Sequence, residues 1–167
     1  SIPIATMSPD ADGIYRRAPI VYKFHNQFLS SLPLSVFLHS DDDTVTSTDN
    51  QLIVNNYAIP LNDSGEAIIN WYNKEIDKYS FSGILSSWQS LNSNEPPLID
   101  PSNFKDAIVV IGSSAVGLHD LKPTPIHSHL SGVEILTTVI SNIYNKELLR
   151  LVPNYVTLFL FINIIIF

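Results

Sequence analysis

The stretch FKDAIVVIGSSAVGLHDLKPTP, residues Phe104–Pro125, decides the fold that we expect. Ile108–Ile111 is an unbroken β-branched run, which is typical of a strand buried on both faces of a sheet. Gly112 ends this run and opens a polar loop. Open α/β sheets place ligands beyond the carboxyl ends of their buried strands. The stretch therefore predicts a core strand near 107–111, followed by a loop where a site would lie.

The loop resembles several nucleotide and catalytic motifs without matching them. A phosphate-binding loop needs Lys and then Ser or Thr after its second glycine, where this chain has Leu118 and His119. A nucleophile elbow around Ser114 needs glycine at position 116, which is Val116. Ser114 also fills the middle glycine position of a dinucleotide fingerprint. These mismatches favour a structural turn, with a bound anion or small ligand as the alternative.

Apolar spacing predicts helices on either side of this strand. Positions three and four apart form one apolar stripe in the segment 132–146, typical of a helix on a sheet; they are Val133, Leu136, Val139, Ile140 and Ile143. Ser80 is placed to cap a helix over Phe81–Gln89, which we expect to bury Phe81, Leu85 and Trp88. Shorter helical segments are expected at Leu32–His39 and Pro101–Phe104.

Hairpins are expected in the first half of the chain. Ile14–Phe24 is rich in β-branched and aromatic residues and is followed by a turn at His25 and Asn26, which predicts a hairpin. A second hairpin is expected to join 57–61 to 67–72 through a turn at 62–65. Ser40–Asn50 is acidic, lacks an apolar period and is expected to be a solvated loop. The predicted fold class is α/β, with a mixed sheet, the buried strand near 107–111 and flanking helices.

Charged residues cluster at the start of the chain. Asp10 and Asp12 precede Arg16 and Arg17 in a segment that turns at Gly13. Opposite charges this close in sequence favour a local salt-bridge network, and anion binding by the arginines is the alternative.

Composition excludes several classes of function. The chain has 167 residues, enough for one domain with a core. Its net charge of −7 and the absence of a basic stripe argue against binding to nucleic acid. Cysteine is absent, which excludes a disulfide framework and a thiolate nucleophile. No cofactor motif is present, so we expect no cofactor.

The C-terminal segment is strongly apolar. Between Tyr155 and Phe167 only Thr157 and Asn163 are polar and none is charged, and Pro153 suits the first turn of a helix. Spanning a bilayer takes about 20 apolar residues, so 153–167 is expected to be the start of a transmembrane helix in a longer protein. A buried helix of a soluble domain is the alternative. Residues 1–150 then form the domain outside the membrane.

Ordered pieces of the sequence resemble a known family. FKDAIVVIG, GLHDLKPTP and SGVEI, followed by Asn142 in a helix, are similar to the type-two CHASE domain, a cyclase- and histidine-kinase-associated sensory extracellular domain. Further pieces agree: PDADGIYRRAPIV, the short IPL with its D-x-G turn, the strand end at Asn70–Tyr72 and the helix start at Tyr79–Phe81. The family's domain begins with a membrane helix and a leading α/β portion, so the resemblance covers its later part.

The resemblance implies a bacterial receptor with this domain outside the cytoplasm. In such receptors one membrane helix precedes the domain and usually three follow it. An output module then lies in the cytoplasm: an adenylate or diguanylate cyclase, a histidine kinase or a serine/threonine kinase. The sensory domain itself is not catalytic. Its implied partners are membrane lipid around the C-terminal helix and an unknown small molecule or physical signal, and homodimerisation is a further expectation.

The family pattern also marks individual positions. The positions that match it are Asp10, Asp12, Gly13, Arg16, Arg17, Pro19, Gly112, Gly117, Asp120, Thr124, Pro125, Gly132 and Glu134. No catalytic role carries over to any of them. Imidazole and carboxylate suit zinc, so a site built from His119, Asp120, His127 and His129 is a hypothesis, although their spacing matches no zinc signature.

Two other functions stay open at this point. A serine hydrolase would use Ser114 with His119 or Asp120, and the missing glycine of the nucleophile elbow argues against it. A structural or dimerisation module without a ligand is compatible with the absence of a diagnostic pocket motif.

Overall fold

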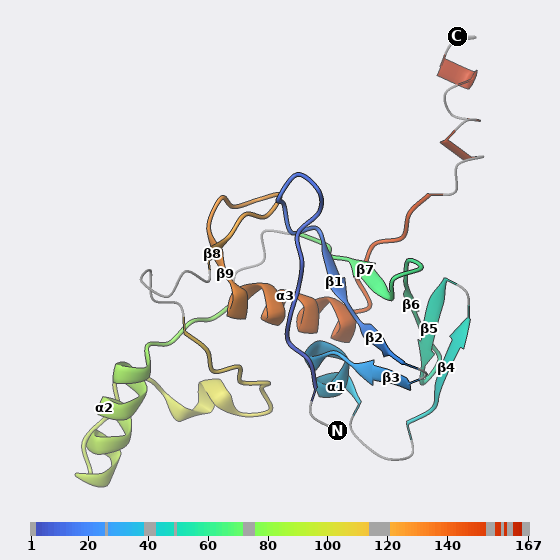
Figure 1. Ribbon diagram of the computed structural model, residues 1–167. Coiled ribbons are helices and arrows are strands. Elements are labelled where there is room, and N and C mark those ends of the chain that lie inside the picture. Colours follow the sequence, from blue (N-terminus) through green and yellow to red (C-terminus); the bar gives the residue numbers. More distant parts are fainter. Residues whose placement is uncertain are drawn as a thin grey trace. The chain divides into compact units, whose positions relative to one another are not determined.

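The computed structural model describes residues 3–25, 27–38, 43–48, 50–71, 76–113, 121–152, 156–157, 159 and 162–164. Its elements (Figure 1) follow one another along the chain as β1 Arg17–Pro19, β2 Val21–Phe24, β3 Gln27–Ser30, α1 Leu32–Phe37, β4 Val45–Thr48, β5 Gln51–Val54, β6 Tyr57–Pro60, β7 Glu66–Ile68, α2 Phe81–Asn92, the 3-10 helix η1 Pro101–Phe104, β8 Leu121–Lys122, β9 Leu130–Ser131 and α3 Gly132–Tyr144. The predicted mixture of helices and strands is confirmed.

The strands form small antiparallel sheets rather than the mixed sheet that we predicted. β1 pairs with β7, β2 with β3, β5 with both β4 and β6, and β8 with β9. The parallel contact seen among the described residues is an isolated bridge between Ile4 and Ser31. β2 and β3, β4 and β5, and β5 and β6 are joined by two-residue turns, and strands joined in this way can pair only antiparallel.

The predicted buried strand near 107–111 is wrong. No strand includes residues 107–113, and Ile108, Val109 and Ile111 are 48%, 53% and 84% exposed. No hydrogen bond among the described residues involves the backbone of 107–112. β-branched residues favour a strand only where a neighbouring strand supplies packing and hydrogen bonds, and the compact unit that holds this run, residues 72–112, contains no strand in its described part.

The first predicted hairpin is confirmed. β2 and β3 pair from Val21 with Ser30 to Phe24 with Gln27, around the expected turn after Phe24. His25 has a positive φ of 53°, as tight hairpin turns require.

The second hairpin forms with different partners. β6 turns back on β5 through Asn55 and Asn56, whose φ values of 45° and 68° suit a two-residue turn. β7 then pairs with β1 instead of β6. The prediction for 40–50 was also incomplete, because β4 lies within it; all of β4 is exposed, as suits an edge strand.

Contacts divide the chain into two units, which we describe separately: the main unit, residues 1–71 and 113–167, and the small unit, residues 72–112. The main unit has a continuous core. Side chains from its strands and from α1 and α3 build this core: Ala18, Ile20, Leu34, Leu52, Val54, Ile59, Ala67, Ile69, Ile135, Val139, Ile143 and Leu148.

α3 is the central helix of the main unit, and its predicted position is confirmed within two residues. Val139, Ile140 and Ile143 of the predicted stripe are buried, whereas Val133 and Leu136 are only half-buried. α3 packs against α1, where the Tyr144 hydroxyl donates to the Val36 carbonyl at 2.9 Å. The ring of Tyr144 also meets Phe37 edge to face, with centroids 5.2 Å apart.

The small unit contains α2 and η1, both close to their predicted positions. The Ser80 hydroxyl caps α2 as expected, accepting from the Gly83 amide at 3.1 Å. The prediction that Phe81, Leu85 and Trp88 are buried is wrong, since they are 72%, 45% and 58% exposed.

The C-terminal segment is described only in part. The described positions between 156 and 164 have helical backbone. Within the described residues we find no helix with the length and apolar character needed to cross a membrane.

Candidate functional site

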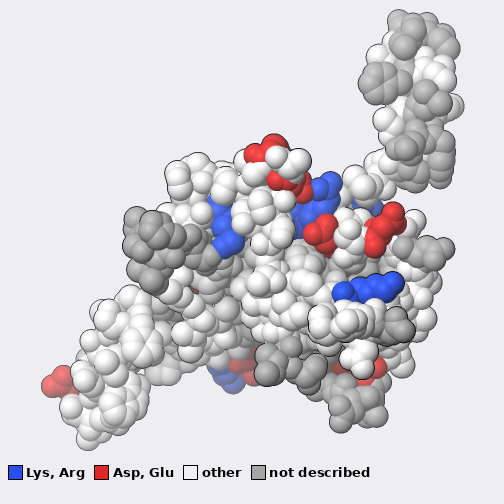
Figure 2. Space-filling view, in the orientation of Figure 1, with Lys and Arg blue, Asp and Glu red and all other residues white. Residues whose placement is uncertain are grey.

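The predicted charge network is present at the N-terminal turn. Arg16 donates to both Asp12 oxygens, at 2.9 and 2.8 Å, and to Asp10 at 3.2 Å. Arg17 binds the other Asp10 oxygen. Gly13 has a φ of 82°, which lets the chain turn between the acids and the arginines. Figure 2 shows acidic and basic residues next to each other on the upper part of the main unit. The two guanidinium groups are engaged within the protein, which weakens the anion-binding alternative.

The network also shifts the pKa values of its charged groups. Hydrogen bonds from Arg16, helped by the Ile14 amide, lower the pKa of the exposed Asp12 carboxyl to about 2. The pKa of Arg16 is raised by its bonds to Asp12 and Asp10. Both groups therefore keep their charges across the physiological pH range.

The N-terminal turn is joined to the segment that leads into α3. The Tyr15 amide donates to the Pro123 carbonyl at 2.9 Å. The Lys122 ammonium lies 5.8 Å from the centre of the Tyr15 ring, within the range of a cation–π contact. These contacts of Tyr15, which adjoins Arg16, tie the N-terminal turn to the residues just before Thr124 and Pro125, two further marked positions.

Thr124 closes a tight turn before α3. This residue is 6% exposed, and its hydroxyl donates to the His127 carbonyl and accepts from the His127 amide, at 3.0 and 3.1 Å. Pro125 lies inside the turn and is exposed, as a residue with a fixed φ suits a turn's first inner position. The two matched positions therefore have a structural role.

Glu134 caps the start of α3. The Ser131 hydroxyl accepts from the Glu134 amide at 3.4 Å, and Glu134 accepts from the Ser131 amide at 3.1 Å and from its hydroxyl at 2.6 Å. This capping box satisfies amides that the first helical turn leaves open. The S-x-x-E spacing at 131–134 would have revealed it, and our sequence reasoning did not use that signal. Gly132 is the buried first residue of α3.

Asn142 ties α3 to the end of the strand region. Asn142 is fully buried; its side-chain oxygen accepts from the Asn70 amide at 2.8 Å, and its amide group donates to the Asn70 carbonyl at 3.4 Å. The two residues are 72 positions apart in sequence. One side chain thus satisfies both backbone groups of a residue just after β7, which fixes the position of α3 against this strand.

The model of one protein family, the CHASE2 domain, matches residues 1–167 of this sequence. The chain belongs to the CHASE2 family. CHASE2 domains are extracytoplasmic sensory domains and are not themselves catalytic. No curated protein and no solved structure matches this chain. The resemblance expected from the ordered sequence pieces is confirmed, and Asn70 and Asn142, two of those pieces, meet in space.

Other marked positions of this CHASE2 domain belong to the small unit or lie outside the described residues. Gly112 is exposed and belongs to the small unit. Four candidates lie outside the described residues: Ser114, Gly117, His119 and Asp120. His127 and His129 are exposed, and the described residues contain no cluster of three metal-binding side chains. The metal and hydrolase hypotheses, which need His119 or Asp120, stay predictions.

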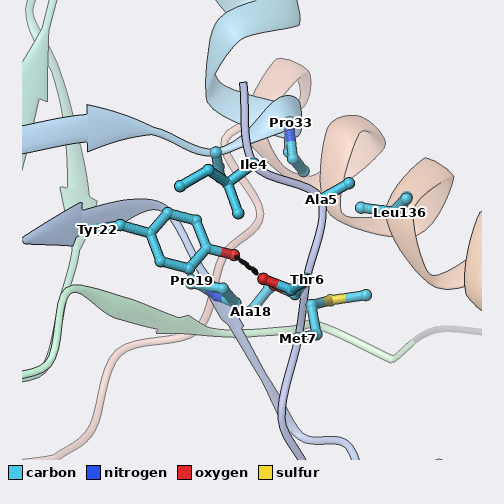
Figure 3. Close-up of a pocket in the computed structure, with 10 residues that line it drawn as sticks. Ile4, Ala5, Thr6, Met7, Ala18, Pro19, Tyr22, Pro33 and Leu136 are labelled. Atoms are coloured by element: carbon cyan, nitrogen blue, oxygen red, sulfur yellow. Dashed lines mark hydrogen bonds between the residues drawn. The ribbon is translucent and has the colours of Figure 1, made fainter. Parts of the chain in front are cut away.

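A small hollow of this CHASE2 domain lies in the main unit beside the N-terminal segment (Figure 3). It has about 160 Å³ of space between the segment 4–7, β1 and α3. Most of its lining is apolar, and the Tyr22 hydroxyl beside it donates to the Thr6 carbonyl. Because that space includes open solvent and leaves no enclosed room even for a water molecule, this hollow is not a binding pocket for a small organic ligand.

Proposed function

We propose that this chain is the sensory input domain of a membrane-bound signal-transduction receptor. Residues 1–150 lie outside the cytoplasm, and 153–167 begin a transmembrane helix. The helices that follow relay the signal to a cytoplasmic output module, a nucleotide cyclase or a protein kinase. Membership of the CHASE2 family and the uncharged run from Tyr155 to Phe167 support this proposal.

One observation carries the relay: the segment after α3 is bound to the strands of the main unit up to the last residues before the apolar run. The Leu149 amide donates to the Ile68 carbonyl at 3.1 Å, forming a bridge to β7. Leu148 is 8% exposed and belongs to the core, and Arg150 donates to the Ala58 carbonyl of β6 at 3.3 Å. A displacement of β7 or α3 would therefore reach residue 150 with little loss.

A signal would enter at the start of α3, where the helix follows the segment 121–131. The loop 121–131 connects the N-terminal turn to the capped start of α3, and Asn142 holds the helix to the strand region. A small molecule or a physical force that shifts this loop would shift the helix. The change required is modest, since a coupling of about 1–3 kcal/mol alters an equilibrium roughly 5- to 150-fold.

A flexible insertion in the exit segment tests the relay. Four glycines placed between Leu148 and Pro153 of the full-length receptor should uncouple the output from the signal, because a flexible linker does not transmit displacement. The same insertion between Glu95 and Pro96, an exposed segment of the small unit, is the control. Output activity measured with and without stimulus decides the matter, and an unchanged response in the first variant would exclude this route.

A further inference from the structure

The segment 146–151, directly after α3, has a backbone conformation that its own sequence does not favour. Its residues read Lys-Glu-Leu-Leu-Arg-Leu, and all of these residue types rank directly after Ala in helix propensity. Pro153 is the first residue beyond α3 that would stop a helix. α3 nevertheless ends at Tyr144, and the segment 146–151 contains no helix. Tertiary contacts therefore override the local preference of this segment.

α3 ends in a strained backbone conformation. Lys146 has a φ of 59°, in the left-handed region, where glycine is the usual residue after a helix. The Lys146 amide donates to the Ile143 carbonyl at 3.1 Å, and the Glu147 amide donates to the Asn142 carbonyl at 2.8 Å. These are the two hydrogen bonds of a Schellman motif, with lysine in place of glycine. Such a conformation persists only where the surrounding structure holds it.

Contacts with the rest of the main unit supply this hold. Leu148 lies in the core, and Leu149 and Arg150 are bound to β7 and β6. The Lys146 ammonium lies 5.7 Å from the centre of the Tyr57 ring, within the range of a cation–π contact. We call this arrangement the docked state. It depends on contacts with distant parts of the chain, whereas the local sequence favours a helix.

The same residues can form a helix that continues α3. The Leu149 amide would then donate to the Asn145 carbonyl instead of to β7, and the left-handed residue would return to an ordinary helical φ. Glu147 and Arg150 would lie one turn apart, where opposite charges attract. Leu148 would leave the core, which makes its burial the main contribution that favours the docked state.

We propose that the segment 146–151 is a conformational switch between the docked state and a state in which α3 continues towards Pro153. Six residues span about 20 Å in a strand and about 9 Å in a helix, so the switch shortens the connection between α3 and Pro153 by up to about 10 Å. The use of this switch in signalling rests on the function proposed above. The switch itself is a property of this chain and is tested without an output module.

Weakening the docked state tests the switch. Leu148→Ala removes the side chain that anchors the segment 146–151 in the core and puts the strongest helix former in its place. In NMR spectra of the full chain, helical carbon chemical shifts end at Tyr144 in the docked state and should then extend to about Leu151. Adding Lys146→Gly should move the last helical residue back to Tyr144, because glycine favours the left-handed conformation and disfavours a continued helix.

Two substitutions of Lys146 test the switch without touching the core. Lys146→Gly and Lys146→Ala both remove the contact with Tyr57, but only glycine adopts the left-handed conformation without strain. The full chain should therefore melt about 2–4 °C higher with Lys146→Gly than with Lys146→Ala. Equal melting temperatures would show that no strain is stored at Lys146 and would overturn the proposal.

Carbon shifts of a disordered chain at 146–151 in Leu148→Ala would also overturn it. The Asn70 amide, which is bonded to the Asn142 side chain, reports in the same spectra whether the domain is still folded. If Leu148→Ala unfolds the domain, the two Lys146 variants decide. None of these measurements uses the receptor's output, so a failure of the switch is distinguishable from a failure of the relay, which the glycine insertion tests.

Discussion

The two units of this chain use their apolar residues in opposite ways. Every hydrophobic residue buried in the described part of the chain belongs to the main unit. In the small unit, the described residues that are buried are Gly83 and Ser87, while ten of its large apolar side chains are exposed: Tyr79, Phe81, Ile84, Leu85, Trp88, Leu91, Leu98, Ile108, Val109 and Ile111. The main unit is therefore held by its core, whereas the described part of the small unit is held by local hydrogen bonds and by a ring contact between Tyr79 and Phe104.

Truncating a side chain should show the largest difference between the two units, because only the main unit should lose much free energy of unfolding. Ile143→Ala removes a fully buried side chain of α3 and should lower the free energy of unfolding by about 2–5 kcal/mol. Leu85→Ala in α2 should change it by less than about 0.5 kcal/mol, because the side chain is already half in water. Urea denaturation of dilute protein measures both, and equal losses would show that the small unit has a core of its own.

Removing the Asn142 amide should have the next largest effect. Asn142→Leu leaves the amide and carbonyl of Asn70 without their partner, and should cost about 2–4 kcal/mol. Asn145→Leu, at the exposed end of the same helix, should cost less than about 1 kcal/mol. The comparison uses the same denaturation experiment. A small loss in Asn142→Leu would mean that α3 keeps its place by apolar packing alone.

Alanine substitutions at two glycines with positive φ distinguish the cost of backbone strain from the cost of a steric clash. Gly13→Ala meets open space, so only the left-handed backbone at φ 82° opposes it, at about 1–2 kcal/mol. Gly65→Ala has a similar φ of 77° and would also place a methyl group 2.7 Å from the Val21 carbonyl oxygen. We therefore expect Gly65→Ala to lower the melting temperature more than Gly13→Ala. Equal shifts would show that β2 can move away from the turn.

The small unit should respond locally to a lost hydrogen bond. Ser87→Ala removes the acceptor of the Ile99 amide and should cost about 1 kcal/mol. Hydrogen exchange at the Ile99 amide should accelerate roughly fivefold, while the buried amides of α3 keep their rates. Faster exchange throughout α3 would reveal that the units unfold together.

The smallest effect is expected from acid at the N-terminal turn. Because Arg16 lowers the pKa of Asp12 from 3.8 to about 2, the stabilisation by this pair is complete above about pH 4 and is lost as the pH falls through 2. Asp12→Asn should abolish this part of the pH dependence. Carboxyl chemical shifts followed by NMR give the pKa directly, and a value near 3.8 would show that the pair does not form in solution.

Local signals in the sequence predicted helices and turns well and predicted burial poorly. Ser80, Pro33 and the stripe along 132–146 each mark a helix through contacts within a few residues, and these helices are present. The run at 107–111 and the apolar face of α2 were expected to be buried because of their composition. Burial depends on what lies beside a segment, and the described part of the small unit contains no strand that could pair with 107–111.

The candidate site shows the same contrast between local features, which the sequence predicts, and long-range contacts, which it does not. The ion pairs of Arg16 and Arg17 were predictable because the four charged residues are adjacent in sequence. The capping box at Ser131 and Glu134 was readable from its spacing and was missed. The bond between Asn70 and Asn142 could not be derived from local patterns, because it depends on the pairing of distant elements.

The way the chain leaves the domain limits the mechanical load that it can carry. Leu149 meets β7 through an isolated bridge, and Arg150 adds a single side-chain bond to β6. Contacts arranged one after another along a segment are peeled apart singly, whereas the bonds of a longer paired strand resist together. A pull from the tail would therefore load these two contacts before it reached α3, so the proposed relay works only under forces that they withstand.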